Sequence, residues 1–155
     1  MQGVGKTHDG LLVLGATNVP WELDPAMRRR FEKRIYISLP EADARAYMAQ
    51  LHLGKETPNN LTPENFKTIG DKTDGYSGAD VMLLCKEGAM RPLRRLMERL
   101  NDDLEPAGFG TDEEVTVGEI TGDDIVGALS ATRPTQTEAH ARRYVEWTNS
   151  FGAVL

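Results

Sequence analysis

The spacing of the apolar side chains changes near residue 40, and this change limits what the chain can fold into. Residues 11–16 form a continuous apolar run bounded by glycines, which is typical of a strand covered on both faces of a parallel sheet. Residues 34–38 alternate in character and are β-branched and aromatic, which predicts a second strand. After Pro40 the apolar residues recur about every 3.6 positions, as in amphipathic helices.

The expected fold class is an α/β remnant with two strands, joined to a mainly helical domain. Two strands without covering helices bury too little apolar surface to be stable alone. We therefore expect the other strands of the sheet to precede residue 1 in a longer polypeptide. The expected regions are 1–39, the end of an α/β domain; 40–135, a helical domain with an acidic linker at 101–119; and 136–155, a C-terminal helix.

Capping residues mark the expected helix starts. A polar side chain that accepts a hydrogen bond from the first turn, or one followed directly by proline, predicts a helix N-terminus. We expect helices to begin after Asp24, Thr62, Ser77, Thr121 and Thr137.

Two further patterns concern the helical region. Its first helix is expected to be amphipathic, with one apolar face formed by Ala44, Tyr47, Met48, Leu51 and His52. Pro92 lies inside the helix that begins after Ser77, and it predicts a kink or a break near Ala89.

Charge and cysteine content exclude several classes of protein. The 155-residue chain carries 18 Lys and Arg against 24 Asp and Glu, a net charge of -6, so binding to nucleic acid is not expected. The single cysteine, Cys85, cannot form an internal disulfide, which fits a reducing compartment and favours the cytoplasm. No apolar run reaches the ~20 residues that cross a bilayer.

Residues 3–7, Gly-Val-Gly-Lys-Thr, look like the end of a phosphate-binding loop. Such a loop needs a leading glycine and a helix directly after Lys-Thr, because the first N–H groups of that helix bind phosphate. The leading glycine is absent here, and residues 8–10 lead into the predicted strand instead. We interpret the segment as a glycine-rich turn, and we expect the chain to hydrolyse no ATP by itself.

Several motifs resemble those of AAA ATPases. Residues 14–18 (Leu-Gly-Ala-Thr-Asn), 28–32 (Arg-Arg-Arg-Phe-Glu) and 36–40 (Tyr-Ile-Ser-Leu-Pro) are similar to the second region of homology of that family. Residues 75–80 (Gly-Tyr-Ser-Gly-Ala-Asp) look like the motif of its small domain. The resemblance covers nearly the whole chain and is closest to the meiotic clade. It implies two strands of a parallel P-loop-type sheet followed by the helical small, or lid, domain.

Within this clade the chain is similar to the vacuolar protein sorting ATPases that disassemble ESCRT-III. Segments 51–54, 60–62 and 131–135 carry this similarity. It implies an ATPase that works as a hexameric ring of identical subunits, acts on ESCRT-III-type polypeptides, and is recruited from the cytoplasm to endosomes through partner proteins. A microtubule-severing enzyme like katanin or spastin is an alternative. A non-catalytic helical interaction module is an alternative of another class.

Residues 101–119 depart from the vacuolar sorting group. Its members carry a β-hairpin insertion there that binds an activating cofactor protein, whereas this stretch is short and polar. Only residues 115–117 are strand-like. Either this protein lacks the insertion, or the chain belongs nearer to katanin and spastin.

Asn18, Arg29 and Arg30 are the candidate catalytic residues. On the sequence alone, an asparagine at a strand end is a turn former, and adjacent arginines form a solvated basic face. The resemblance implies instead that Asn18 is sensor 1, which contacts the γ-phosphate and orients the attacking water. It also implies that Arg29 and Arg30 are arginine fingers, which reach into the ATP site of the neighbouring subunit.

Met48, His52, Gly78 and Ala79 are the candidate nucleotide-binding residues. Met48 and His52 are one helical turn apart and share a face, while Gly78 and Ala79 are small residues at a helix start. Ordinary packing explains both features equally well. The resemblance implies contact with the adenine and ribose of ATP or ADP. The ligands of the accompanying Mg²⁺ are expected outside this chain, so no metal-binding residue is assigned.

Overall fold

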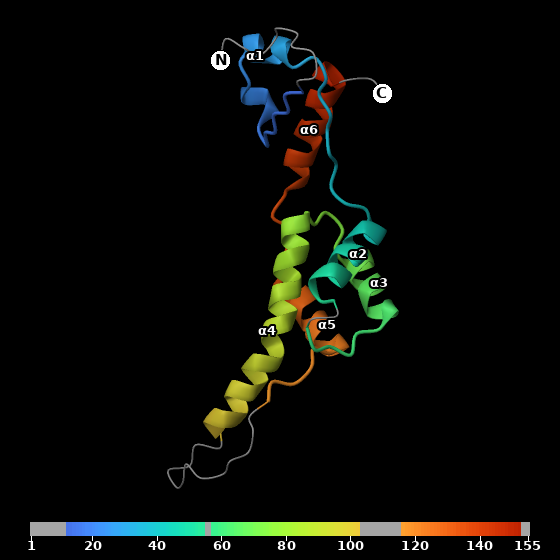
Figure 1. Ribbon diagram of the computed structural model, residues 1–155, viewed down its shortest axis with the longest axis vertical. Helices are drawn as coiled ribbons and strands as arrows, with labels where there is room; N and C mark the ends of the chain where they lie inside the picture. Colours follow the sequence, from blue (N-terminus) through green and yellow to red (C-terminus); the bar gives the residue numbers. More distant parts are fainter. Residues whose placement is uncertain (1–11, 55–56, 103–115, 153–155) are drawn as a thin grey trace. The chain divides into compact units, whose positions relative to one another are not determined.

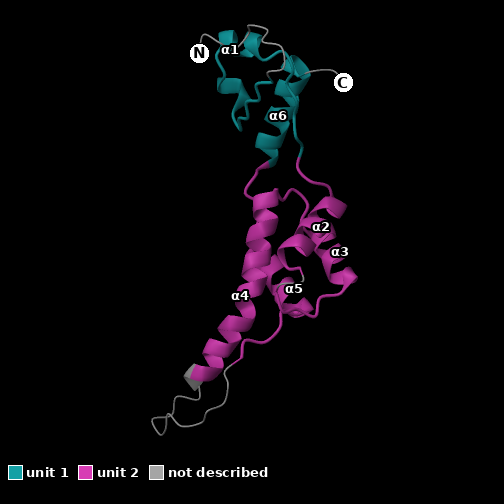
Figure 2. Ribbon diagram, viewed as in Figure 1, with its two compact units in different colours: residues 1–38, 138–155 teal, residues 39–137 magenta. Residues whose placement is uncertain are grey.

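The computed structural model describes residues 12–54, 57–102 and 116–152, and it divides into two compact units (Figure 2). The split unit combines residues 1–38 with residues 138–155. The helical unit comprises residues 39–137. Segments from opposite ends of the sequence therefore build one unit, and the middle of the sequence builds the other.

The described part of the helical unit contains α2 (Ala42–His52), α3 (Pro63–Lys72), α4 (Gly78–Asp102) and α5 (Gly122–Ala131). α2 packs against α3 and α4, and α5 packs against the same two helices, so the four form a closed ring around one core (Figure 1). The buried apolar side chains of this core are Ala49, Leu53, Ile69, Tyr76, Val81, Leu84, Cys85, Ile120, Ile125 and Ala128.

The split unit contains a short 3-10 helix (η1, Pro20–Glu22), α1 (Pro25–Arg30) and α6 (Glu138–Phe151). α6 packs against the N-terminal segment through aromatic rings. The Tyr144 ring lies 5.0 Å from that of Trp21 and 5.7 Å from that of Tyr36, measured between centroids. These contacts join residues that lie more than one hundred positions apart in the sequence.

The predicted helix starts are confirmed, since a described helix begins directly after each capping residue. Thr62 and Thr121 each form a reciprocal capping box, in which the cap and the third helical residue accept hydrogen bonds from each other's backbone N–H. The Thr121 N–H donates to Asp124 Oδ2 over 2.9 Å. Local hydrogen bonding of this kind is encoded within four residues, which is why the sequence predicts it well.

α4 runs without interruption from Gly78 to Asp102, so the predicted break near Ala89 is wrong. Proline removes one N–H group and crowds the carbonyl four residues back, here that of Gly88. Gly88 lets α5 approach closely, because a Cβ at this position would lie 3.1 Å from Ile125 Cδ1. Pro92 is itself buried. Packing against α5 on this side of α4 therefore outweighs the lost hydrogen bond.

α2 turns a different face to the core from the apolar face that its sequence pattern defines. Arg45 and Ala49 are buried, whereas Tyr47 and Leu51 are 61% and 64% exposed. Apolar periodicity failed here because an arginine occupies the buried face. An arginine can be buried when its guanidinium donors all find acceptors.

The Arg45 guanidinium finds those acceptors at two backbone carbonyls and a hydroxyl. Nη1 donates to the Pro40 carbonyl over 2.6 Å, and Nη2 donates to the Gly70 carbonyl over 2.7 Å. Nε donates to Thr73 Oγ1 over 3.0 Å. The Gly70 carbonyl belongs to the last turn of α3, where helix carbonyls lack intrahelical partners and attract cations. Arg45 therefore ties the start of the helical unit to the C-terminal end of α3.

Glycine is required at two positions beside this contact. A Cβ at Gly70 would lie 2.4 Å from the Ala42 carbonyl oxygen, so α3 can approach the start of α2 only without a side chain there. Gly75 has a φ of 76°, in the left-handed region that favours glycine, and it turns the chain from α3 into α4.

The two predicted strands are not formed within the described residues. Residues 12–16 and 34–38 have no strand assignment, and Leu12, Leu14 and Ile37 are 79%, 85% and 87% exposed. A strand exists only where a neighbouring strand completes its hydrogen bonds. The described chain contains an isolated parallel bridge, between Asn59 and Ile120, which lies in the helical unit. The observed fold is thus mainly helical, and two apolar segments stay unpaired.

We predict that Arg45→Met lowers the free energy of unfolding by about 3 kcal/mol, because it removes the guanidinium donor from a buried carbonyl, a half-buried carbonyl and a buried hydroxyl. Urea unfolding followed by circular dichroism measures this. Arg94→Met is the matched control, since Arg94 forms an exposed ion pair with Glu87. The control should cost no more than about 0.5 kcal/mol. Equal effects of the two exchanges would contradict the structural role assigned to Arg45.

Candidate functional site

The sequence-predicted site residues fall into two groups, one in each unit. Asn18, Arg29 and Arg30 belong to the split unit. Met48, His52, Gly78 and Ala79 belong to the helical unit. Among these residues the structure shows a direct contact between Met48 and Gly78.

Asn18 lies in a turn that hydrogen bonds hold on both sides. Its side chain is exposed. Its backbone carbonyl accepts a hydrogen bond from the Tyr144 hydroxyl, and the Val19 N–H donates to Thr17 Oγ1 over 3.1 Å. η1 follows directly, starting at the buried Pro20. The turn therefore presents the Asn18 amide to solvent on a backbone that is fixed from two directions.

The three adjacent arginines differ in their surroundings. α1 is capped by Asp24, which accepts from the Ala26 N–H over 2.6 Å. The Arg28 guanidinium lies 4.7 Å from the centre of the Phe151 ring in a cation–π contact. Arg29 and Arg30 are exposed at the C-terminal end of α1. Arg28 therefore anchors α1 to α6, while its two neighbours extend from the surface.

Arg34 reinforces this anchor. It donates to the backbone carbonyl of Arg28 over 2.9 Å and to that of Phe151. Carbonyls at the ends of α1 and α6 have no partner within their helices, so a cation is well placed there. Arg34 thereby joins the C-terminal ends of the two helices.

Met48 and Gly78 are neighbours in the helical unit. A Cβ at Gly78 would lie 3.8 Å from Met48 Sδ, so the thioether rests against the start of α4. Met48 also packs against the core, while His52 and Ala79 are exposed. The Met48 thioether thus lies against the first residue of α4, and His52 follows Met48 by one helical turn on α2. A thioether beside a glycine backbone can make apolar contact with a flat ring.

Asp80 holds the start of α4 in place. This buried carboxylate accepts from the Ser77 N–H over 2.8 Å and from the Ser77 hydroxyl over 2.7 Å. Burial by itself raises the pKa of Asp80, but the hydrogen bonds donated by Ser77 and Thr135 outweigh it, so the pKa lies below its ordinary value. Asp80 was not recognised from the sequence, although the Ser-x-x-Asp spacing of a capping box could have indicated it.

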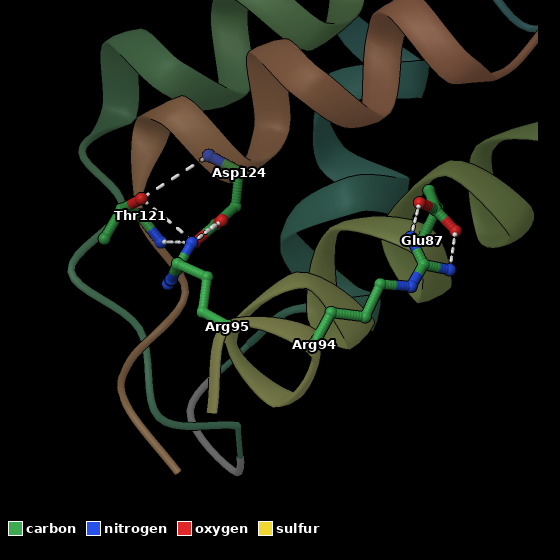
Figure 3. Close-up of polar contacts among 5 residues, drawn as sticks. All are labelled: Glu87, Arg94, Arg95, Thr121 and Asp124. Carbon is green, nitrogen blue, oxygen red and sulfur yellow. Dashed lines mark hydrogen bonds and ion pairs between the residues drawn. The ribbon is translucent and has the colours of Figure 1, made fainter. Parts of the chain in front are cut away.

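A second buried carboxylate joins α4 to the start of α5 (Figure 3). The Arg95 guanidinium contacts both oxygens of Asp124, over 3.1 Å for the Nη2–Oδ2 contact, and Thr121 donates to the same carboxylate. Burial raises the pKa of Asp124, but Arg95 and Thr121 outweigh it and the pKa lies below its usual range. Arg94 and Glu87, also in Figure 3, form an ion pair within α4 whose Nη2–Oε2 distance is 3.0 Å.

A metal site and a reactive cysteine are two further kinds of centre to consider among the described residues. These residues contain no group of three or more His, Cys, Asp or Glu side chains arranged to hold a metal ion. Burial raises the pKa of the Cys85 thiol to about 12, so it is not a nucleophile at neutral pH. None of the described helices is both long and apolar enough to cross a bilayer. The glycine-rich segment 3–7 lies outside the described residues.

Three family profiles match consecutive parts of the chain. Residues 1–39 match the ATPase family associated with various cellular activities (AAA), and residues 63–105 match the AAA+ lid domain. Residues 102–152 match the Vps4 C terminal oligomerisation domain. Together the matches extend into both units and leave residues 40–62 unmatched.

Individual relatives agree with these profiles. Vacuolar protein sorting-associated protein 4B of Mus musculus is 43% identical, over 98% of this chain and 40% of its own length. The katanin p60 ATPase-containing A-like 2 protein of Xenopus tropicalis is 37% identical, over 99% of this chain and 29% of its own length. The crystal structure of the FIGL-1 AAA domain in complex with ADP has a TM-score of 0.75 and 41% identity, covering 92% of this chain and 46% of that one.

The two sequence alignments differ in length. The alignment with the mouse protein extends over 181 residues, more than the 155 of this chain, whereas the alignment with the Xenopus protein extends over 159. The mouse protein therefore has residues in this region that have no counterpart here.

We predict that Asp80→Asn lowers the free energy of unfolding by about 1 kcal/mol at pH 7, because the ionised cap of α4 is lost. The pKa of Asp80 is lower in the folded protein than its ordinary value of 3.8. Its stabilisation is therefore complete well above that value and is lost as the pH falls through the folded pKa. The difference in free energy of unfolding between the wild type and the variant should decrease below about pH 4.

Denaturant unfolding at pH 7, 5 and 3 measures this difference. Asp71→Asn, the same exchange at an exposed position of α3, should change stability by less than about 0.5 kcal/mol. A difference for Asp80→Asn that stays constant down to pH 3 would show that its charge is not the source.

Proposed function

We infer the function of this chain from its membership: it belongs to the AAA ATPase family and, within it, to the Vps4-like members of the meiotic clade. It carries the end of the AAA domain, the lid and the oligomerisation region of that family. The chain spans about 40% of the length of its Vps4 relatives, so the activity, substrates and partners of the whole protein are proposals.

We propose that the chain supplies part of the ATP-hydrolysing site of a self-assembling, protein-remodelling ATPase. Asn18 acts as sensor 1 in its own subunit, Arg29 and Arg30 act in the site of the neighbouring subunit, and the helical unit forms the lid over the nucleotide base. The observation that carries this proposal is the exposure of Arg29 and Arg30 at the end of α1, a capped helix that Arg28 attaches to Phe151 of α6.

Each residue type suits its proposed role. A guanidinium stays charged and offers several donors in a rigid plane, so an exposed arginine on a fixed helix can neutralise charge on a neighbour's phosphate. The Asn18 amide can donate to phosphate and accept from water at the same time. A fixed backbone under each side chain limits the reorganisation that hydrolysis requires.

The two unpaired apolar segments support the proposal that this chain forms one AAA domain together with further strands. Leu12, Leu14 and Ile37 are largely exposed in this chain, although residues of this kind are normally buried in a sheet. We propose that residues 11–16 and 34–38 become strands of a parallel P-loop-type sheet together with the part of the AAA domain that holds the phosphate-binding loop. Asn18 then lies at the carboxyl end of its strand, where ligands bind in open α/β sheets.

The nucleotide is expected on the Met48–Gly78 surface. Met48, Gly78 and Ala79 would contact the adenine and His52 the ribose of ATP or ADP. The contact between Met48 and Gly78 and the exposure of His52 and Ala79 support this assignment. A bound ATP would supply the phosphoanhydride bond that is hydrolysed. Mg²⁺ would neutralise charge on its phosphates, and the ligands of this ion are proposed outside this chain. The lid residues contribute binding and orientation of the base.

Self-assembly has a candidate surface on α4. Its outward side is a stripe of half-exposed apolar residues: Met82, Leu83, Met90, Met97 and Leu100. These residues lie within about 100° of one another around the helix axis. α4 leads directly into the region that matches the oligomerisation domain. We propose that a second copy of the chain covers this stripe.

The proposed substrate is an ESCRT-III-type polypeptide at endosomes, reached through partner proteins. A microtubule-severing activity is the second candidate. One observation supports this second candidate, namely the lengths of the alignments. The katanin-like relative aligns over nearly the length of this chain, whereas the mouse Vps4B relative aligns over a longer region. Co-sedimentation of the protein with ESCRT-III filaments and with microtubules distinguishes the two.

We predict that Arg29→Ala and Arg30→Ala, in the polypeptide with a complete AAA domain, reduce ATP turnover by about 1000-fold. Mixing either variant with a variant of the phosphate-binding loop should restore part of the activity, because each subunit then supplies what its neighbour lacks. Steady-state phosphate release measures both effects. Arg142→Ala, which removes an exposed arginine from α6, should retain activity. Mixtures without recovery would contradict action in trans.

We predict that Met97→Asp weakens self-association at least about ten-fold, because assembly would bury a charge in an apolar contact. Sedimentation velocity over a concentration series measures the association. Val126→Asp is the control, since Val126 is 55% exposed on α5 and Met97 is 56% exposed on α4. Wild-type association of both variants would exclude the α4 stripe as the assembly surface.

A further inference from the structure

We propose that α6 positions sensor 1, with Tyr144 as the positioning residue that sets the orientation of Asn18. This inference rests on the proposed role of Asn18 and adds a dependence of hydrolysis on the C-terminal helix. Tyr144 touches no substrate in this scheme and acts only through the backbone of Asn18.

The peptide unit between Asn18 and Val19 is engaged at both of its polar groups. Its carbonyl accepts from the Tyr144 hydroxyl, and its N–H donates to Thr17 Oγ1 over 3.1 Å. A peptide plane held at both groups cannot rotate freely about its bonds to the neighbouring Cα atoms. The direction of the Asn18 side chain follows from that plane. One of the two hydrogen bonds comes from the neighbouring Thr17, and the other comes from Tyr144, which is far away in the sequence.

The Tyr144 ring is itself held from two sides. Its centroid lies 5.0 Å from that of Trp21 in a tilted arrangement and 5.7 Å from that of Tyr36 in a stacked one, with an interplanar angle of 18°. Arg143 adds a cation–π contact with Trp21, at 3.9 Å from the ring centroid. A ring confined in this way delivers its hydroxyl to one place, which makes it a suitable donor for a fixed carbonyl.

α6 is also held near its C-terminal end. Phe151 follows Tyr144 by two helical turns and so lies on nearly the same face. Its ring lies beneath Arg28, and its carbonyl accepts from Arg34. The two contacts fix both the rotation and the axial position of the helix. One helix thereby holds the turn of Asn18 and the helix that carries Arg29 and Arg30.

Packing and positioning can be separated at Tyr144. Its ring supplies the packing, and its hydroxyl supplies only the hydrogen bond to Asn18. Tyr144→Phe therefore keeps the ring stack and releases the carbonyl. Tyr36→Phe is the matched control, because Tyr36 belongs to the same stack and its hydroxyl makes no hydrogen bond within the described residues.

The test uses the polypeptide with a complete AAA domain. We expect Tyr144→Phe to reduce kcat roughly five-fold, as the loss of one orienting hydrogen bond allows, with KM for ATP and self-association unchanged. Tyr36→Phe should match wild type. In an Asn18→Ala background Tyr144→Phe should have no further effect, because the residue that it positions is gone. Amide hydrogen exchange around Val19 should accelerate in Tyr144→Phe and not in Tyr36→Phe.

Each contrary result has a distinct meaning. A wild-type protein without ATP turnover overturns the proposed function and the positioning role with it. If the wild type is active and kcat is unchanged in Tyr144→Phe, only the proposal that Tyr144 positions Asn18 is overturned. A five-fold loss that persists in the Asn18→Ala background, or one accompanied by weaker self-association, assigns Tyr144 a structural role and also overturns the proposal.

Discussion

The burial of Arg45 determines how the helical unit is arranged. Its guanidinium is satisfied by the carbonyls of Pro40 and Gly70 and by the Thr73 hydroxyl, so α2 must turn this residue inward. The apolar residues on another side of α2 then remain at the surface, and Met48 comes to rest against the start of α4. The surface proposed to bind adenine is thus a consequence of where a positive charge is buried. An apolar residue at position 45 would remove the link between the start of this unit and the end of α3.

Features that depend on a few consecutive residues were predicted from the sequence, and features that depend on distant partners were not. The helix starts after Thr62 and Thr121 follow from capping hydrogen bonds within four residues. The inward face of α2 depends on acceptors up to 28 positions from Arg45, which no helical periodicity contains. The continuity of α4 through Pro92 depends on packing against α5. The predicted strands depend on neighbouring strands, and the described residues provide none.

The same distinction applies to the candidate site. The sequence marks three adjacent arginines and an asparagine after an apolar run, and the resemblance to AAA ATPases is what implies phosphate chemistry for them. It does not distinguish Arg28 from its neighbours, because the distinction is made by Phe151 at the other end of the chain. The sequence places Tyr144 only in a C-terminal helix, and its hydroxyl contact with Asn18 spans 126 positions. The types of residue at the candidate site could therefore be taken from the sequence. The different surroundings of Arg28 and its two neighbours could be seen only in the structure.

The ion pair between Arg95 and Asp124 has a consequence for how this region can vary between proteins. It clasps α4 to the first turn of α5, on either side of the segment from residue 103 to 115. Entropy penalises a longer loop only slowly, and less still when its ends are already clasped together. The described residues of α4 beyond Arg95 contribute nothing to the buried core. Insertions or deletions within the segment from residue 103 to 115 can therefore accumulate during evolution while the helical bundle keeps its packing.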